Sequence, residues 1–590
     1  MQRITAGGGE HCAPTDEAEL PAHATTAQRR QRAPRRYAGS QRPPATGYGW
    51  RTTRARRLRN QRIGPITSLF AARASSQGAC MTTIRTLVVA AEAFPLAKTG
   101  GLGDAVAGMV QALGHRPGGV DVQCELLMPA YRGTLDRLYR PRTVARLGGL
   151  PGGPASLVRG HCPGSGLSVL LLRNDALYDR PGIYVDDSGQ GYPDNARRYA
   201  ALAHAAARLA HGLPGLRPPH VVHAHDWHAA LAPLLIHAAG LHYVKTLLTI
   251  HNLAFQGTFP AELASALGIP LACRHDDGAL SDDRVNFLKA GIRYATRVTT
   301  VSRAYAREIL TPAFGCGLHG LLRARGADLS PVPNGIDTAL WNPAADPHLG
   351  GLRFDALDMR NKACCKAALQ AELGLQLRAD ATVLAMGSRL TGQKMADVAI
   401  AALPALLEAH EHLQFALIGR GEPDLEAALR ALAARYPGRC AVHIGYDEPL
   451  AHRLHAGADL LLHGSRFEPF GLTPLYAMRY GTLPVASRVG GMVDTIRDPG
   501  PAIEESCAGQ GTGFLFDGSE PADMQLAVAR ALRALAKPAV RDAMRRNAMQ
   551  ADFSWRTSAQ AYAGLYANLA SGPQRGRVPA PTLPLLANAA

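Results

Sequence analysis

The segment Arg85-Thr-Leu-Val-Val-Ala-Ala-Glu-Ala-Phe-Pro-Leu-Ala-Lys-Thr-Gly-Gly-Leu-Gly-Asp104 combines three local signals that indicate the fold class. The apolar, β-branched run Arg85–Ala91 predicts a buried strand. A glycine-containing loop follows, and an apolar helix pattern begins near Leu102. A strand, a loop and a helix in this order begin a βαβ unit, which predicts a parallel sheet with helices on its faces.

The same alternation continues to residue 535 in two series. In the first series we expect strands at Arg85–Ala91, Val122–Met128, Leu167–Leu172, His220–Ala224, Thr246–Ile250 and Arg297–Val301, with a helix at Asn195–His211. In the second we expect strands at Thr382–Met386, Gln414–Ile418, Ala441–Ile444, Leu460–His463 and Leu483–Ala486, with helices at Ala396–His410, Asp424–Arg435 and Ala522–Leu535. The pattern predicts an α/β protein with two Rossmann-like, doubly wound domains facing across a cleft, joined near residues 331–351.

The first 80 residues differ in composition from the rest. They contain 14 Arg, no Lys and four acidic residues, so they carry +10 of the net charge of +17. The remaining charge is mild for 510 residues, which argues against a nucleic-acid partner. Without apolar periodicity, residues 1–80 are expected to be disordered. Because Met81 directly precedes the first strand, a mis-assigned start is favoured over a transit peptide or a native tail.

The expected domains are therefore residues 81–340 and 341–571, followed by a flexible tail at 572–590. The chain contains no apolar run long enough to predict a transmembrane helix. Its ten cysteines lack metal-ligand spacing and are expected to be reduced thiols of a cytoplasmic protein.

Three groups of polar residues follow predicted strands in the first half. In the first loop, Gly100 and Gly101 at a helix start, with Lys98 beside them, suit a diphosphate, although a plain glycine turn also fits. The second group, His225, Asp226, Trp227 and His228, directly follows the expected strand His220–Ala224. The third group, His251 and Asn252, directly follows the expected strand Thr246–Ile250. The residue types of the second group suit a sugar site. A metal site, or a core Trp with surface His residues, are the alternatives.

Cations and one carboxylate follow the strands of the second half. Arg389 and Lys394 share one loop and could both reach a phosphate, or form a solvated loop. Glu468 precedes an apolar helix, where it could act in catalysis or cap the helix. Gly490 and Gly491 follow the next strand and open another helix.

These residues lie in ordered motifs that resemble bacterial glycogen synthases and plant starch synthases. The motifs are Lys98–Asp104, His223–His228, Ile250–Ala254, Asn286–Gly291, Pro333–Asp337, Ser388–Lys394, Ser465–Pro469 and Tyr480–Pro484, and Ser554–Gln560 is similar to the C-terminal helix of the family. The resemblance covers residues 84–567. It implies a GT-B glycosyltransferase that moves glucose from ADP-glucose to the non-reducing end of an α-1,4-glucan with retention. It also implies no metal, no cofactor and no membrane partner.

The resemblance further implies roles for individual residues. Lys98, Gly101 and Asp104 would lie on the donor side, and Arg389 and Lys394 would neutralise the departing diphosphate. His251 would place its backbone carbonyl or ring against the glucose, and Glu468 would hold donor hydroxyls or stabilise an oxocarbenium-like state. Asp226 is also expected to be catalytic, and with Trp227 and Tyr184 it would line the sugar and acceptor side. Asn334 would help hold the donor, and the remaining expected substrate contacts are Asn252, Gly490 and Gly491.

The chain departs from the family pattern at four positions: Met395 replaces a Gly, Phe470 a Cys, Pro474 a Gln and His319 an Asp. Because Phe470 and Pro474 lie near Glu468 in sequence, the donor preference stays open. A related transferase that uses UDP-glucose or another acceptor, and a weakly active glucan-binding regulator, are the alternative functions.

Overall fold

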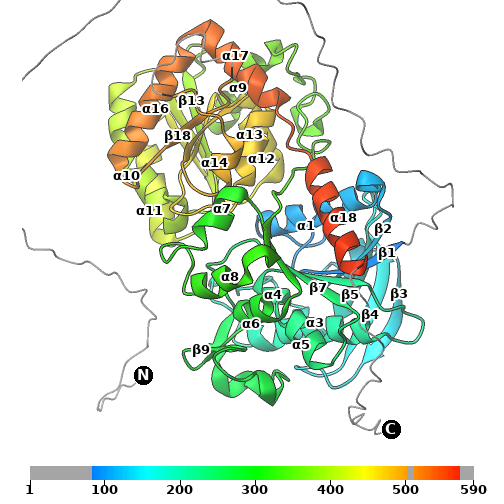
Figure 1. Cartoon of the computed structure of the whole chain (residues 1–590). Coiled ribbons are helices and arrows are strands. Elements are labelled where there is room, and N and C mark those ends of the chain that lie inside the picture. The colour runs from blue at the N-terminus through cyan, green and yellow to red at the C-terminus, as the bar shows by residue number, and fades with distance from the viewer. Residues whose placement is uncertain (1–82, 501–509, 572–590) are drawn as a thin grey trace, which may run out of the picture. The chain divides into compact units, whose positions relative to one another are not determined.

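The computed structural model describes residues 83–500 and 510–571, and Figure 1 shows the arrangement of their elements. The expected extension, residues 1–80, and the expected tail, residues 572–590, lie outside the described residues. Within the described part, no helix is both long and apolar enough to cross a membrane.

The first sheet has nine strands in the order β12-β11-β7-β6-β1-β2-β5-β4-β3. Its strands are β1 (Ile84–Val89), β2 (Val122–Pro129), β3 (Tyr139–Leu147), β4 (Ala155–His161), β5 (Ser168–Arg173), β6 (Val221–His225), β7 (Lys245–Ile250), β11 (Arg297–Thr300) and β12 (Leu329–Pro331). All neighbours from β12 to β5 pair in parallel, and β4 and β3 extend the sheet in antiparallel pairing. The six expected strands are thus confirmed within two residues, whereas β3, β4 and β12 were missed.

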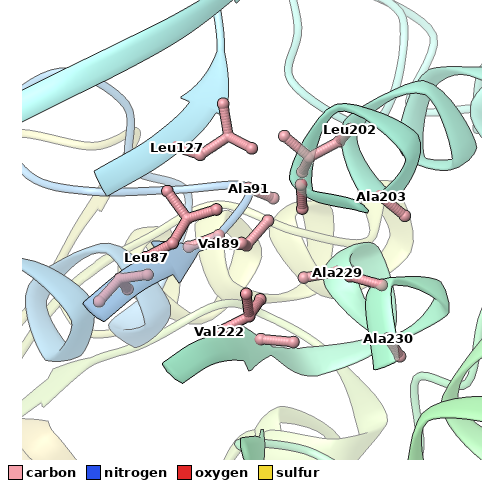
Figure 2. Packing of buried hydrophobic residues seen from close by; sticks show 14 of the residues in the cluster. Leu87, Val89, Ala91, Leu127, Leu202, Ala203, Val222, Ala229 and Ala230 are labelled. Atoms are coloured by element: carbon pink, nitrogen blue, oxygen red, sulfur yellow. The ribbon is translucent and has the colours of Figure 1, made fainter. Parts of the chain in front are cut away.

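Helices cover both faces of this sheet, which confirms the expected doubly wound arrangement. They are α1 (Gly101–Leu113), α2 (Asp175–Tyr178), α3 (Asn195–His211), α4 (Asp226–Ala229), α5 (Leu231–Ala238), α6 (Phe287–Tyr294), α7 (Arg303–Glu308) and α8 (His319–Arg325). Figure 2 shows Leu202 of α3 and Ala229 of α4 packing toward Val89 of β1 and Val222 of β6. A small separate sheet contains β8 (Thr258–Pro260), β9 (Leu280–Ser281) and β10 (Arg284–Asn286).

The second sheet is wholly parallel, with six strands in the order β15-β14-β13-β16-β17-β18. The strands are β13 (Thr382–Gly387), β14 (Leu413–Gly419), β15 (Cys440–Ile444), β16 (Leu460–His463), β17 (Leu483–Ser487) and β18 (Phe514–Phe516). The helices are α9 (Arg360–Leu373), α10 (Ala396–Ala409), α11 (Pro423–Arg435), α12 (Glu448–Gly457), α13 (Leu472–Arg479), α14 (Gly491–Thr495), α16 (Pro521–Leu535) and α17 (Pro538–Gln550). The five expected strands are all present, and β18 was missed.

The last described helix, α18 (Arg556–Ser571), leaves the second sheet and packs on the first. In Figure 1 it lies beside α1, and its Tyr562 and Tyr566 are buried in the core of the first sheet. Trp555, just before α18, lies so close to Gly108 of α1 that no side chain would fit at that glycine. The structure therefore differs from the expected division at 341–571, because α18 belongs by its contacts to the first lobe. We call the first sheet with its helices and α18 the first lobe, and the second sheet with its helices the second lobe.

Candidate active site

Glu468 lies in the loop between β16 and α13 and is 8% exposed. One carboxylate oxygen, Oε2, accepts hydrogen bonds from Ser465 Oγ at 3.1 Å and from His463 Nε2 at 3.2 Å, and Lys394 Nζ makes an ion pair with it. Its hydrogen bonds and ion pair all go to Lys394, His463 and Ser465 rather than to the first turn of α13, whose capping residue is Gly471. The helix-capping interpretation of Glu468 is therefore wrong, and the carboxylate forms the centre of a buried polar cluster.

The charge on Glu468 is retained despite burial. Burial alone would raise the pKa of its carboxyl, but Lys394 and the hydrogen bond from His463 outweigh that effect and hold the pKa well below its ordinary value. Lys394 follows β13 at the end of the loop that also carries Arg389. Arg389 is exposed, and no described side chain pairs with its guanidinium. The loop thus carries Lys394, which is paired with the Glu468 carboxylate, and Arg389, whose guanidinium pairs with no described side chain.

Gly490 and Gly491 support the backbone of this cluster. A Cβ at Gly490 would lie 1.6 Å from the carbonyl oxygen of Glu468, and one at Gly491 would lie 2.3 Å from that of Phe470. The Gly491 N–H also donates to the Glu468 carbonyl at 3.2 Å, and Gly490 has a φ of 49°. Glycine is required at both positions because the backbones touch. The two glycines hold the loop that carries Glu468, and their expected contact with substrate stays a prediction.

In the first lobe, Asp226 anchors the segment that carries His251. Asp226 is 7% exposed and adopts a left-handed φ of 55° directly after β6. Its Oδ1 accepts from the His251 N–H at 2.6 Å and from the Asn252 N–H at 3.2 Å. Burial raises the pKa of Asp226 to about 7, against the opposing effect of these two hydrogen bonds. Asp226 therefore positions the backbone after β7.

The histidines beside Asp226 are neutral. His251 Nε2 lies 2.9 Å from His225 Nδ1, and burial lowers the pKa of His251 to about 3. Burial also lowers the pKa of His225 and His228 well below the ordinary value, helped by neighbouring histidines at His225 and by Arg198 at His228. Among the residues that the structure describes, no group of three or more His, Cys, Asp or Glu side chains could hold a metal ion.

Trp227 and Tyr184 form an aromatic wall beside this cluster. The Trp227 ring packs on His228 with centroids 4.1 Å apart and edge-on to Tyr199 at 4.9 Å, and Gly257 leaves no room for a side chain against it. Tyr184 stacks on His228 at 4.7 Å. The indole is partly buried against the core of the first lobe, as the alternative of a core Trp expected, but the surface His residues of that alternative are wrong, because His225 and His228 are 1% and 6% exposed. Its contact with a sugar stays a prediction.

Glu92 is a site residue that sequence reasoning missed. It is 2% exposed and accepts hydrogen bonds from Thr99 N–H at 2.6 Å, Thr99 Oγ at 2.8 Å and Tyr184 OH at 2.6 Å. Glu92 thus ties the glycine loop to the aromatic wall, and burial raises the pKa of its carboxyl. The available signal was an acidic residue directly after an apolar strand. His463 was also missed, and its available signal was a polar residue in the last position of a predicted apolar strand.

The glycine loop also makes contacts with the second lobe. Lys98 Nζ lies 3.0 Å from Asp104 Oδ2 and 3.5 Å from Glu448 Oε2, at the start of α12. Asp104 also accepts from Tyr476 OH of α13 at 3.1 Å. A Cβ at Gly101 would lie 2.9 Å from Leu472, the first residue of α13. The loop that was expected to bind diphosphate therefore lies next to the helix that follows Glu468.

The other expected residues make local contacts. Asn252 Oδ1 accepts from the Ala254 N–H at 3.1 Å, and the Asn334 N–H donates to the Val301 carbonyl at 3.3 Å. Of the four departures from the family pattern, Met395 stands out because it has a φ of 52° and a fully buried side chain. Left-handed backbone at this position explains the usual glycine of the family. Phe470 and Pro474 are buried, and His319 begins α8.

Comparison with known proteins agrees with this architecture. Residues 85–324 match the starch synthase catalytic domain, and residues 374–551 match the glycosyl transferases group 1. A glycogen synthase of Bordetella bronchiseptica is 99% identical over 510 residues, which cover 86% of this chain and all of the relative. A glycogen synthase of Bordetella petrii is 61% identical over 503 residues, covering 85% of this chain and 96% of the relative.

Solved structures agree with the fold. The catalytic domain of starch synthase IV from Arabidopsis thaliana, bound to ADP and acarbose, superposes with a TM-score of 0.74 at 30% identity and covers 83% of this chain and all of that domain. A sucrose-phosphate synthase from Thermosynechococcus elongatus, at 17% identity with a TM-score of 0.53, covers 82% of this chain and 99% of its own and shares the fold alone. With two Rossmann-like lobes and these relatives, the chain belongs to the glycogen synthase and starch synthase family of GT-B glycosyltransferases.

Proposed function

We propose that the chain transfers glucose from ADP-glucose to the non-reducing end of an α-1,4-glucan, with retention of the α configuration, and so elongates glycogen in the cytoplasm. The observation that carries this proposal is the ion pair between the partly buried Lys394 and the buried Glu468, with Arg389, which no described side chain pairs with, on the same loop as Lys394. The named relatives, and a related structure bound to ADP, support the choice of substrates. ADP-glucose is a co-substrate, and the proposal includes no cofactor and no metal.

The second-lobe residues act on the bond that breaks. As the glucosyl–phosphate bond lengthens, negative charge grows on the diphosphate, and Arg389 and Lys394 neutralise it. Positive charge grows on the anomeric carbon, and the ionised Glu468 stabilises it or holds donor hydroxyls. Preorganised charges of this kind commonly lower a barrier by about 3–4 kcal/mol each. Gly490 and Gly491 keep Glu468 in place.

The first-lobe residues bind both substrates. Lys98 contributes a third cation for the diphosphate. Its ammonium group, which pairs with Asp104 and Glu448 in this structure, then also contacts the diphosphate. The backbone carbonyl or ring of His251, held by Asp226, faces the donor glucose. Tyr184 and Trp227 face the glucan, and Asn252, Asn334, Gly101 and Asp104 complete the contacts with the substrates.

A release assay tests the proposal. Wild-type protein is incubated with glycogen and either ADP-glucose or UDP-glucose, and free ADP or UDP is measured along with glucose incorporated into glycogen. We expect release from ADP-glucose that depends on glycogen, and new linkages that an α-1,4-specific exo-amylase removes. Preferred release from UDP-glucose would reassign the donor. Absence of release from either donor, with retained glycogen binding, would instead favour the glucan-binding regulator.

A further inference from the structure

A strip of polar side chains crosses the face of the first sheet that α18 covers. His223 of β6 and Thr249 of β7 are both 0% exposed, and so is Thr299 of β11. Side chains alternate along a strand, so Val222 faces α4 while His223 faces α18. Polar groups are costly to bury unless each finds a partner. Packing alone therefore does not explain why these three polar side chains are buried in the core.

Both ring nitrogens of His223 have partners. Nδ1 lies 2.7 Å from the hydroxyl of Tyr566 on α18, and Nε2 lies 2.6 Å from Thr249 Oγ1. Thr249 Oγ1 lies a further 2.6 Å from Thr299 Oγ1. Because hydrogen bonds act on both sides of the imidazole, its rotation is fixed. Tyr566 is 343 residues away in the chain, so only the folded protein supplies this contact.

The protons on this network follow from burial. Burial lowers the pKa of His223 well below its ordinary value, and the neighbouring His251 acts in the same direction, so the ring is neutral. Burial raises the pKa of Tyr566 well above its ordinary value, so the phenol keeps its proton. Tyr566 then donates to Nδ1 and Nε2–H donates to Thr249, whose own hydroxyl donates to Thr299.

His225 connects this network to His251. The ring of His225 packs against that of His223 with centroids 4.1 Å apart and planes tilted by 37°. Its Nδ1 lies 2.9 Å from His251 Nε2, whereas its buried Nε2 has no partner among the described residues. With one hydrogen bond only, the His225 ring depends on the fixed ring of His223 for its orientation.

We propose that Tyr566 and Thr249 are positioning residues for glucosyl transfer. Through His223 they orient His225, and His225 orients the ring of His251. The proposal rests on the proposed function, in which His251 contacts the donor glucose. It makes α18, which follows the second lobe in sequence, part of the machinery of the first-lobe site.

Tyr566→Phe tests the proposal because it removes one hydroxyl and little volume. We expect kcat to fall about tenfold, with the KM for ADP-glucose changed less than about twofold, since an unpaired buried nitrogen lets the ring shift. Tyr562→Phe is the matched control, because its hydroxyl interacts with Thr249, at 3.4 Å, and with Thr299, whereas the ring nitrogens of His223 bond to Tyr566 and Thr249 instead. Thr249→Val should behave like Tyr566→Phe, and Thr249→Ser, which keeps the hydroxyl, should restore most of kcat.

A second measurement separates positioning from loss of stability. His225→Ala cuts the connection between His223 and His251, so Tyr566→Phe should lower kcat no further in that background. A loss that multiplies there would overturn the proposal, as would equal kcat values for Tyr566→Phe and Tyr562→Phe. Wild-type ADP release in the same assay reports on the proposed function separately: its absence would overturn both, whereas normal release with an unaffected Tyr566→Phe would overturn the positioning role alone.

Discussion

Two polar clusters occupy equivalent places in the two lobes but differ in ionisation. The first-lobe cluster consists of His225, Asp226 and His251 after β6 and β7, and the second-lobe cluster consists of Lys394, His463 and Glu468 after β13 and β16. Parallel strands end at the same sheet edge, so each lobe gathers its polar residues in the same way. Burial keeps His225 and His251 neutral and raises the pKa of Asp226 to about 7 in the first cluster, whereas Lys394 keeps Glu468 ionised in the second.

The contrast shows that burial does not by itself decide ionisation. Asp226 and Glu468 are 7% and 8% exposed, yet the pKa of Asp226 rises to about 7 and that of Glu468 falls well below its ordinary value. Asp226 has backbone N–H groups as partners, whereas Glu468 has an ammonium group. A charged cluster suits a phosphate leaving group and a developing cation, and a neutral one suits sugar hydroxyls.

Removal of the second-lobe carboxylate should have the largest effect. For Glu468→Ala we expect kcat to fall by about 10²-fold or more with little change in the donor KM, because the carboxylate acts mainly in the transition state. Steady-state kinetics and the thermal midpoint should be measured together. A near-normal kcat with a lowered midpoint would reduce Glu468 to a structural residue and remove the functional contrast between the clusters.

Removal of the cation should make the second cluster resemble the first. Lys394→Ala should raise the donor KM and lower kcat/KM by about 10–100-fold, since Lys394 contacts the diphosphate before and during bond cleavage. Burial would then act on Glu468 without Lys394, leaving only His463 and Ser465 as partners, so the pKa of Glu468 should rise. We expect a new decline of kcat toward acidic pH that the wild type lacks. Identical pH profiles would contradict this explanation.

Asp226→Asn probes the first cluster while it keeps an acceptor for the two N–H groups. A carboxyl whose pKa is raised in the folded state stabilises the fold fully at pH values below its unfolded-state pKa of about 4. This contribution is lost as the pH rises to the folded-state pKa of about 7. From pH 5 to about pH 7 the wild type should therefore lose stability relative to the variant by about 1.4 kcal/mol per pH unit, and the loss should level off by pH 8. Thermal midpoints across this pH range measure this, and a constant difference would mean that Asp226 is not protonated in the fold.

Met395→Gly should give the smallest effect, on the loop that carries Lys394. Relief of the left-handed backbone contributes roughly 1–2 kcal/mol, whereas loss of the buried thioether side chain costs about 2–5 kcal/mol. We expect the free energy of unfolding to fall by about 1–3 kcal/mol, with kcat near that of the wild type. Met395→Leu, which keeps the volume and the strain, is the control. A stabilised glycine variant would show that backbone strain outweighs burial here.

Much of the fold was predictable because buried parallel strands are short apolar runs. Two of the missed strands lack that signal: β3 (Tyr-Arg-Pro-Arg-Thr-Val-Ala-Arg-Leu) is mostly exposed at a sheet edge, and β12 has three residues. Glu468, Lys394 and Arg389 could be identified as candidates because charges are rare directly after buried strands. The pairing of Lys394 with Glu468 could not be predicted, because it joins loops 74 residues apart.

Local patterns in the chain were therefore enough to specify two doubly wound lobes and the strand ends that carry the polar residues. Only the tertiary structure decided which residues form hydrogen bonds or ion pairs with one another. Spacing did not indicate that Asp226 holds the backbone of His251, or that Glu92 ties Thr99 to Tyr184. The return of α18 to the first lobe was equally hidden, since an amphipathic helix can pack on any apolar face and the choice depends on complementary shape, here Trp555 against Gly108.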